Sequence, residues 1–89
     1  MDPLQRMRQA IREQRYRISA HANNEMADDD LIAADIESII VTGKIAQAFT
    51  HDPRGPRYEV SGRATDGRQA YVVCRFLLSG VLMVITAYA

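Results

Sequence analysis

The strongest constraint on the fold is an alternation of apolar and polar residues in the last third of the chain. Between Arg57 and Tyr88, one set of alternate positions is apolar and the other is rich in arginine and tyrosine. A period of two residues is typical of strands that bury only one face. The pattern predicts a sheet with one face on a core and one polar face that carries Arg57, Glu59, Arg63, Tyr71, Arg75, Thr86 and Tyr88.

Three turn signals divide this half of the chain into strands. Residues 51–56 form a rigid turn with two prolines, Asp66-Gly67 is typical of a two-residue hairpin, and Ser79-Gly80 forms the third turn. They separate predicted strands at 45–50, about 57–64, 69–76 and 81–88. Residues 44–89 are therefore predicted to form a four-stranded antiparallel sheet.

The residues before the sheet are predicted to be helical. In the N-terminal helix, assigned to residues 1–15, Asp2 is the N-cap, Pro3 the first helical residue, and Gln5 completes a capping-box spacing. Residues 16–43 form the second helical region. It begins with a short strand or extended connector at 16–18, followed by a helix that Ser19 caps and that runs to about Met26.

A third helix is predicted from the spacing of isoleucines and ends at Gly43. Ile32, Ile36, Ile39 and Ile40 share one face, and Asp28–Asp30 match the positive end of a helix dipole at its start. The chain is thus predicted to be one α+β domain over residues 1–89, with two to three N-terminal helices on one face of the sheet. So small a domain has little stability to spare, which favours self-association, such as a homodimer, or a partner.

Several classes of protein do not fit the composition. The single Cys74 excludes an internal disulfide framework, and with His21 and His51 it matches no zinc pattern, so no metal or cofactor is expected. The apolar run at 81–85 is far below the ~20 residues of a membrane span, and the N-terminus lacks the apolar core of a signal peptide. We expect a cytoplasmic protein without membrane contact.

The charges cancel overall but are unevenly distributed. Residues 1–17 carry five arginines against two acids, residues 23–37 carry six acids and no base, and residues 38–89 carry six bases against three acids. Nearly all bases are arginines, whose planar guanidinium suits phosphate and carboxylate groups. Zero net charge predicts that any binding to RNA is weak and fades as salt rises.

An ordered set of short motifs resembles the small bacterial family labelled domain of unknown function 4258. The resemblance covers about Tyr16 to Tyr88 and rests on residues 16–22, Met26, 35–37, 43–45, 52–57, 66–68, 72–74 and 85–88. It implies a RelE-like fold, shared with small RNase toxins of toxin–antitoxin pairs. It also implies an antitoxin partner of the zinc-finger or DNA-binding type, as seen beside MqsR-like toxins. Many relatives have arginines in the second helix and the turn after it, where this chain has Glu25 and Asp29. A cationic site on that helix is therefore not expected in this chain.

A toxin that cleaves RNA without a metal needs a base, cations for the phosphorane and an acid. We assign His21 as the base, because the dipole at a helix start keeps its ring neutral. Arg57 and Arg75 are predicted to clamp the phosphate, and Tyr88 to act as the acid or as a stacking ring. The outer RNA contacts are predicted to be Arg54, Arg63 and Tyr71, the last by stacking.

A function without chemistry is the alternative. The polar face and the sheet edge would then dock another protein or a second copy of the chain, with arginines and tyrosines as interface anchors. The acidic segment 23–37 would complement the arginine-rich N-terminal helix of a neighbour. Under this hypothesis the chain is an interaction module or a homo-oligomerising domain.

Overall fold

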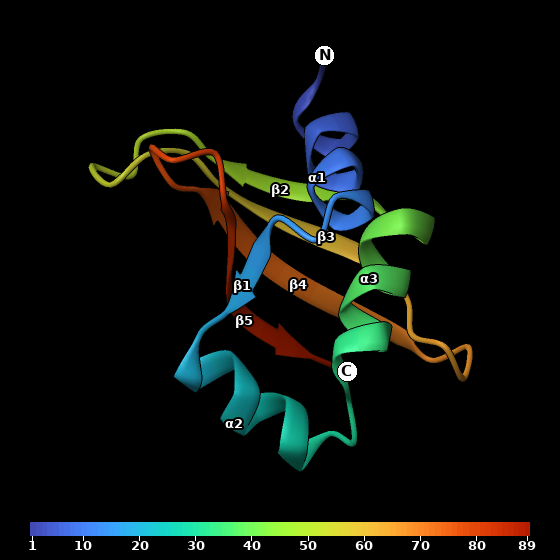
Figure 1. Cartoon of the computed structure of the whole chain (residues 1–89). Coiled ribbons are helices and arrows are strands. Elements are labelled where there is room, and N and C mark those ends of the chain that lie inside the picture. The colour runs from blue at the N-terminus through green and yellow to red at the C-terminus, as the bar shows by residue number, and fades with distance from the viewer.

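The computed structural model describes all 89 residues and contains three helices and one five-stranded sheet (Figure 1). The helices supply one side of a single buried core and the sheet supplies the other, so the chain is an α+β fold. The elements in chain order are α1 (Pro3–Arg12), β1 (Tyr16–Ile18), α2 (Ala20–Asp28), α3 (Ala33–Thr42), β2 (Lys44–Phe49), β3 (Arg57–Arg63), β4 (Gln69–Phe76) and β5 (Leu82–Tyr88).

The sheet is mixed, and the prediction of four antiparallel strands is wrong by one strand. The strand order is β1-β5-β4-β3-β2, and β2 to β5 pair antiparallel as predicted. The additional strand β1 pairs parallel with β5, from Tyr16 beside Leu82 to Ile18 beside Val84. Three residues are too few for an alternating pattern to appear, and the partner strand lies far along the chain. Residues 16–18, predicted as a short strand or extended connector, thus form a strand of the sheet, and what the prediction lacks is their pairing with β5.

The core lies where the alternation places it. Val60, Val72 and Cys74 face the helices and are fully buried, as predicted. Ile36, Ile39 and Ile40 of α3 are also fully buried and belong to the same cluster. The Met7 sulfur of α1 lies 3.8 Å from the Cys74 sulfur, so α1 also reaches the sheet. In Figure 1, α1 and α3 lie over the sheet while α2 lies beside β5.

The start of α3 differs from the prediction. Asp28–Asp30 end α2 instead of capping α3, and the guanidinium of Arg68 donates hydrogen bonds to the carbonyls of Asp29 and Asp30. Ile32 is the N-cap of α3 and is exposed, so it does not share the buried face. The cap interaction comes from inside the helix, where an Asp35 carboxylate oxygen accepts the Ile32 N–H at 2.9 Å.

Asp35 also ties α3 to the hairpin between β3 and β4. Its other carboxylate oxygen accepts the hydroxyl of Thr65 at 2.6 Å and the Thr65 N–H at 2.9 Å. The pKa of Asp35 is lowered, chiefly by the Thr65 hydroxyl. A carboxyl with a lowered pKa stabilises the fold above its unfolded pKa of about 3.9, and that stabilisation is lost as pH falls through the folded pKa.

The lowered pKa of Asp35 predicts that part of the thermal stability is lost in acid through this one carboxyl group. Between pH 5 and pH 2, the Tm of the wild type should fall more steeply than the Tm of Asp35→Asn, which has no charge to lose. Asp28→Asn, which changes an exposed aspartate at the end of α2, is the control and should keep the wild-type slope. Thermal scans followed by circular dichroism measure this, and parallel curves for all three proteins would contradict it.

Two glycines allow α3 to end directly against the sheet. A Cβ at Gly62 would lie 2.2 Å from the Ile39 carbonyl oxygen, and one at Gly43 would lie 2.5 Å from the same atom. Arg8 of α1 donates hydrogen bonds to the carbonyls of Ile40 and Gly43 and so caps this end of the helix. The C-terminal end of α3, the start of β2 and strand β3 thus form one rigid unit on the helix side of the sheet.

Candidate functional site

The sheet face opposite the helices carries no other helix or strand, and we call it the open face. Strand pairing places its side chains in four rows across the sheet. From one end to the other, these rows are Arg63–Gln69; Lys44–Ser61–Tyr71–Tyr88; Gln47–Glu59–Val73–Thr86; and Phe49–Arg57 with Arg75–Met83. Five of the other six residues of the polar pattern therefore lie in the row of Glu59 or in an adjacent row.

A bulge in β5 brings the last two residues of the pattern onto this face. Cys74 pairs with Val84 and Val73 pairs with Thr86, so Ile85 is an extra residue. Without it, strict alternation from Val84 would turn Thr86 and Tyr88 toward the helices. Bulges redirect side chains in this way and are common beside functional sites. The bulge therefore places Tyr88 beside Tyr71.

Tyr71 and Tyr88 form a stacked pair above the carboxylate of Glu59. Their ring centroids are 5.1 Å apart with planes at 22°, and the Tyr88 hydroxyl donates to Glu59 Oε1 at 2.8 Å. This hydrogen bond, followed by burial, raises the pKa of Tyr88 to about 12. The phenol thus keeps its proton at neutral pH and orients the Glu59 carboxylate. Glu59 is not among the site residues predicted from the sequence, although its place in the alternating pattern is a signal for it.

At the other end of the open face, three arginines surround Asp52 of the loop between β2 and β3. Its carboxylate lies 3.3 Å from Arg75, 3.5 Å from Arg54 and 3.9 Å from Arg57. The Arg54 backbone N–H, then Arg75, lowers the pKa of Asp52. Arg57 and Arg75 lie on one face as the phosphate-clamp prediction requires, but Asp52 holds them. Three guanidiniums and one carboxylate leave two positive charges.

Two N–H groups of this arginine cluster have no partner. Arg75 Nη1 and Arg57 Nε are buried without a hydrogen bond, which is costly for charged donors. Arg75 is only 8% exposed, whereas a third of the Arg57 side chain is accessible and packs over Phe49 at 4.5 Å. A ligand on the surface therefore reaches Arg57 and the exposed Arg54 more readily than Arg75, which lies on the predicted face but is buried.

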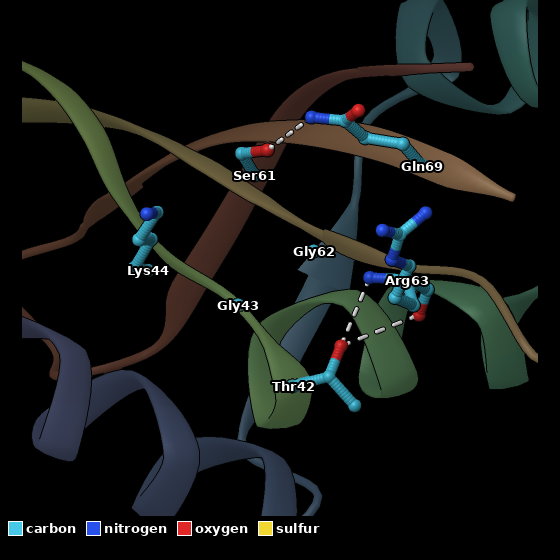
Figure 2. A pocket seen from close by; sticks show the side chains of 7 residues that line it. All are labelled: Thr42, Gly43, Lys44, Ser61, Gly62, Arg63 and Gln69. Atoms are coloured by element: carbon cyan, nitrogen blue, oxygen red, sulfur yellow. Dashed lines mark hydrogen bonds between the residues drawn. The ribbon is translucent and has the colours of Figure 1, made fainter. Parts of the chain in front are cut away.

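The first two rows border a hollow that we call the polar groove (Figure 2). Its volume is about 410 Å³, and it is lined by Thr42, Gly43, Lys44, Ser61, Gly62, Arg63 and Gln69. The lining includes two cations and no carboxylate. Figure 2 shows Lys44 and Arg63 on opposite sides of Gly43 and Gly62, with the Gln69 amide donating to Ser61 Oγ at 3.1 Å.

His21 lies at the margin of this surface. It occupies the first turn of α2, as predicted, and its side chain is 71% exposed. Its Nε2 lies 3.4 Å from Glu25 Oε1, and the same oxygen accepts the Thr86 hydroxyl and the Ala87 N–H. Glu25 thus links His21 to the row of Glu59, but the structure does not bring His21 into contact with Arg75 or Tyr88.

Other chemical groups contribute little to the site. No three His, Cys, Asp or Glu side chains gather in a way that could hold a metal ion. Burial raises the pKa of the Cys74 thiol to about 12, so it stays protonated under the helices. None of the three helices combines the length and apolar character needed to cross a membrane.

Comparison with known proteins gives one match. A family model described as Domain of unknown function (DUF4258) matches residues 18–89. No curated protein and no solved structure matches the chain. The matched region begins at the end of β1 and contains all four rows of the open face and the polar groove.

Proposed function

The chain belongs to the family described as Domain of unknown function (DUF4258), and we propose that it cleaves single-stranded RNA on the open face without a metal ion. In this proposal it is the toxin of a bacterial toxin–antitoxin pair, a role suggested by its resemblance to RelE-like and MqsR-like toxins. The observation that carries the proposal is the position of Glu59. It lies between a row with stacked tyrosines and a row with arginines, on a face that no helix covers.

Glu59 is the general base in this mechanism. Its carboxylate takes the proton from a ribose 2′-hydroxyl, whose oxygen attacks the adjacent phosphorus. The bond from phosphorus to the 5′-oxygen breaks, and water on this open surface protonates the leaving oxygen. The products are a 2′,3′-cyclic phosphate and a 5′-hydroxyl. The hydrogen bond from Tyr88 fixes the Glu59 carboxylate, which supports this assignment.

The arginine cluster stabilises the charge that develops on the phosphate. Arg57 lies two residues from Glu59 on the same strand face, which corresponds to about 6.8 Å along β3. The accessible part of the Arg57 guanidinium can donate to phosphate oxygens, and the buried guanidinium of Arg75 adds positive charge beside it. The cluster keeps an excess of two positive charges over Asp52, so a phosphate can join without displacing the carboxylate.

His21 is the competing base. The sequence predicts this role for it, and it lies in the first turn of α2 with Glu25 between it and Thr86. Glu59 has the better position because it adjoins both the tyrosine pair and Arg57, whereas His21 is at the edge. If Glu59 is the base, Glu59→Gln removes cleavage; if His21 is the base, His21→Ala removes it.

Tyr88 tests the role of the tyrosine pair. Tyr88→Phe keeps the ring but loses the hydrogen bond to Glu59, so single-turnover cleavage should slow about tenfold while RNA affinity stays within about twofold. Tyr88→Ala also removes the stacking surface, which is worth about 1–3 kcal/mol per base, so affinity should fall at least about fivefold. Fluorescence anisotropy and quenched-flow cleavage measure the two effects. Equal affinities for all three proteins would contradict the stacking role.

Growth after induced expression tests the proposed function in the cell. We expect arrest that is relieved by co-expression of the neighbouring gene, and new 5′-hydroxyl RNA ends in arrested cells. Glu59→Gln should abolish arrest, while Glu13→Gln, the same change on the surface outside the open face, should not. Normal growth with the folded wild-type protein, or arrest by Glu59→Gln, would contradict the proposal.

A protein-interaction module remains the second candidate because of β2. This strand is the sheet edge and is almost entirely exposed, including Phe49 at 37%. Exposed edges offer unpaired backbone groups to a strand of another chain, including a second copy. Light scattering of the purified protein distinguishes monomer from dimer, and a monomer up to high concentration would contradict homo-oligomerisation.

A further inference from the structure

We propose that the polar groove is a second phosphate-binding subsite, which holds a phosphodiester of the same RNA strand whose scissile phosphate lies at Glu59. This inference rests on the proposed function and extends it from a single reacting phosphate to a track along β3. The ligand is a phosphodiester of single-stranded RNA, held beyond the stacked tyrosines and away from the arginine cluster.

The charge of the groove favours an anion. Lys44 and Arg63 both project from strand positions on the open face, and neither forms an ion pair. The two acids of the open face are engaged elsewhere, Asp52 by the arginine cluster and Glu59 by Tyr88. The groove therefore has two cationic side chains with no internal counter-ion.

Its polar groups are donors that remain available. Arg63 uses only Nη1, in a bond to the Gly67 carbonyl at 3.3 Å, and its other guanidinium N–H groups have no partner. Ser61 Oγ accepts the Gln69 amide, so the serine hydroxyl hydrogen is left to donate. Ammonium, guanidinium and hydroxyl groups around a hollow are a suitable donor set for phosphate oxygens.

The nearby end of α3 does not oppose an anion as a free helix C-terminus would. Carbonyls at a helix C-terminus carry partial negative charge. Here Arg8 reaches under the helix end and donates to the Ile40 carbonyl at 3.2 Å and to the Gly43 carbonyl at 2.8 Å.

The groove continues the site described above. Lys44 and Ser61 belong to the same row as Tyr71 and Tyr88, so the groove adjoins the stacking pair. Along β3 the open-face residues run Arg57, Glu59, Ser61, Arg63, and Arg63 lies about 14 Å from Glu59. Cationic groups on both sides of the base, with aromatic rings between, form the arrangement that tracks a single strand.

The salt dependence of RNA binding tests this subsite. Each phosphate of a single strand that a protein neutralises adds about 0.7 to the slope of log K against log salt, so Lys44→Ala/Arg63→Ala, which removes both cations of this one subsite, should reduce the slope by about 0.7 for a hexanucleotide. The control is Arg6→Ala/Arg12→Ala, which removes two exposed cations of α1, a helix on the other side of the sheet. Its slope should equal that of the wild type. A dinucleotide, which spans only the scissile phosphate, should bind all three proteins equally.

The outcomes separate this subsite from the catalytic proposal. Identical slopes for both double variants overturn the subsite, whether or not the wild type cleaves RNA. A reduced slope in the Lys44→Ala/Arg63→Ala variant, with no cleavage by the wild type, supports the subsite and removes only the nuclease function. Failure of the wild type to bind the hexanucleotide at low salt overturns the subsite. Circular dichroism of each variant establishes that the fold is unchanged.

Discussion

Replacing Glu59 with glutamine is expected to slow RNA cleavage by about 10²–10⁴-fold, the usual effect of losing a general base. Glutamine keeps an oxygen that accepts the Tyr88 hydroxyl, so the arrangement of the open face should persist. The loss should therefore appear in the single-turnover rate and not in the affinity for RNA. Rapid mixing of excess protein with a fluorescent RNA measures the rate, and Glu13→Gln serves as the control of equal chemistry.

The same assay decides between the two candidate bases. If Glu59 is the base, His21→Ala should change the rate by less than about tenfold, because the imidazole lies at the edge of the open face. A large loss in His21→Ala with a small one in Glu59→Gln would assign the base to His21. Arg57→Ala is the better probe of the arginine cluster than Arg75→Ala, since loss of the buried Arg75 also removes a partner of Asp52.

Gly62→Ala is expected to cost about 3 kcal/mol or more of unfolding free energy, because overpacking against backbone cannot be relieved by a side-chain rotation. The added Cβ would lie 2.2 Å from the Ile39 carbonyl oxygen and 2.9 Å from the Ile39 carbonyl carbon. Helix α3 would have to move off β3. A domain of this size has only about 4–13 kcal/mol in total, so the loss is a large fraction of its stability.

Urea denaturation measures this effect. The Gly62→Ala midpoint should fall markedly, and Ser61→Ala, the adjacent residue on the open side of the same strand, should keep a midpoint close to that of the wild type. Unchanged stability in Gly62→Ala would mean that α3 does not approach the sheet as closely as the structure indicates.

Local patterns are sufficient to predict most of the fold. Asp2 and Gln5 form the predicted capping box, Ser19 caps α2, and Val60 and Val72 face the core. These features depend on residues close in sequence or on a repeated period, which a sequence displays directly. Strand β1 depends instead on a parallel pairing with β5, far along the chain. The prediction misplaces Asp28–Asp30 because the helix dipole favours acids at a helix start, whereas here they end α2 and the distant Arg68 binds the carbonyls of Asp29 and Asp30.

The contacts of the functional site are harder to predict than the fold, because they join residues that are far apart in the sequence. The alternating pattern identifies the residues of the open face, but not which of them touch. That depends on the bulge at Ile85, which brings Tyr88 to Glu59, and on the loop that carries Asp52 to Arg75. Neither feature has a local signal. Lys44 is likewise missing from the predicted site, because its importance comes from a neighbouring strand that places it beside Ser61.

The central claim is that the open face cleaves RNA through attack by a ribose 2′-hydroxyl. Its most direct test is incubation of the purified protein, in excess chelator, with an RNA oligonucleotide and with the same oligonucleotide carrying one 2′-deoxyribose at the mapped cleavage position. We expect the RNA to yield a 2′,3′-cyclic phosphate and a 5′-hydroxyl end, and the substituted strand to remain uncut at that position. Cleavage of the substituted strand at the same position, or no cleavage of RNA by folded protein, would contradict the claim.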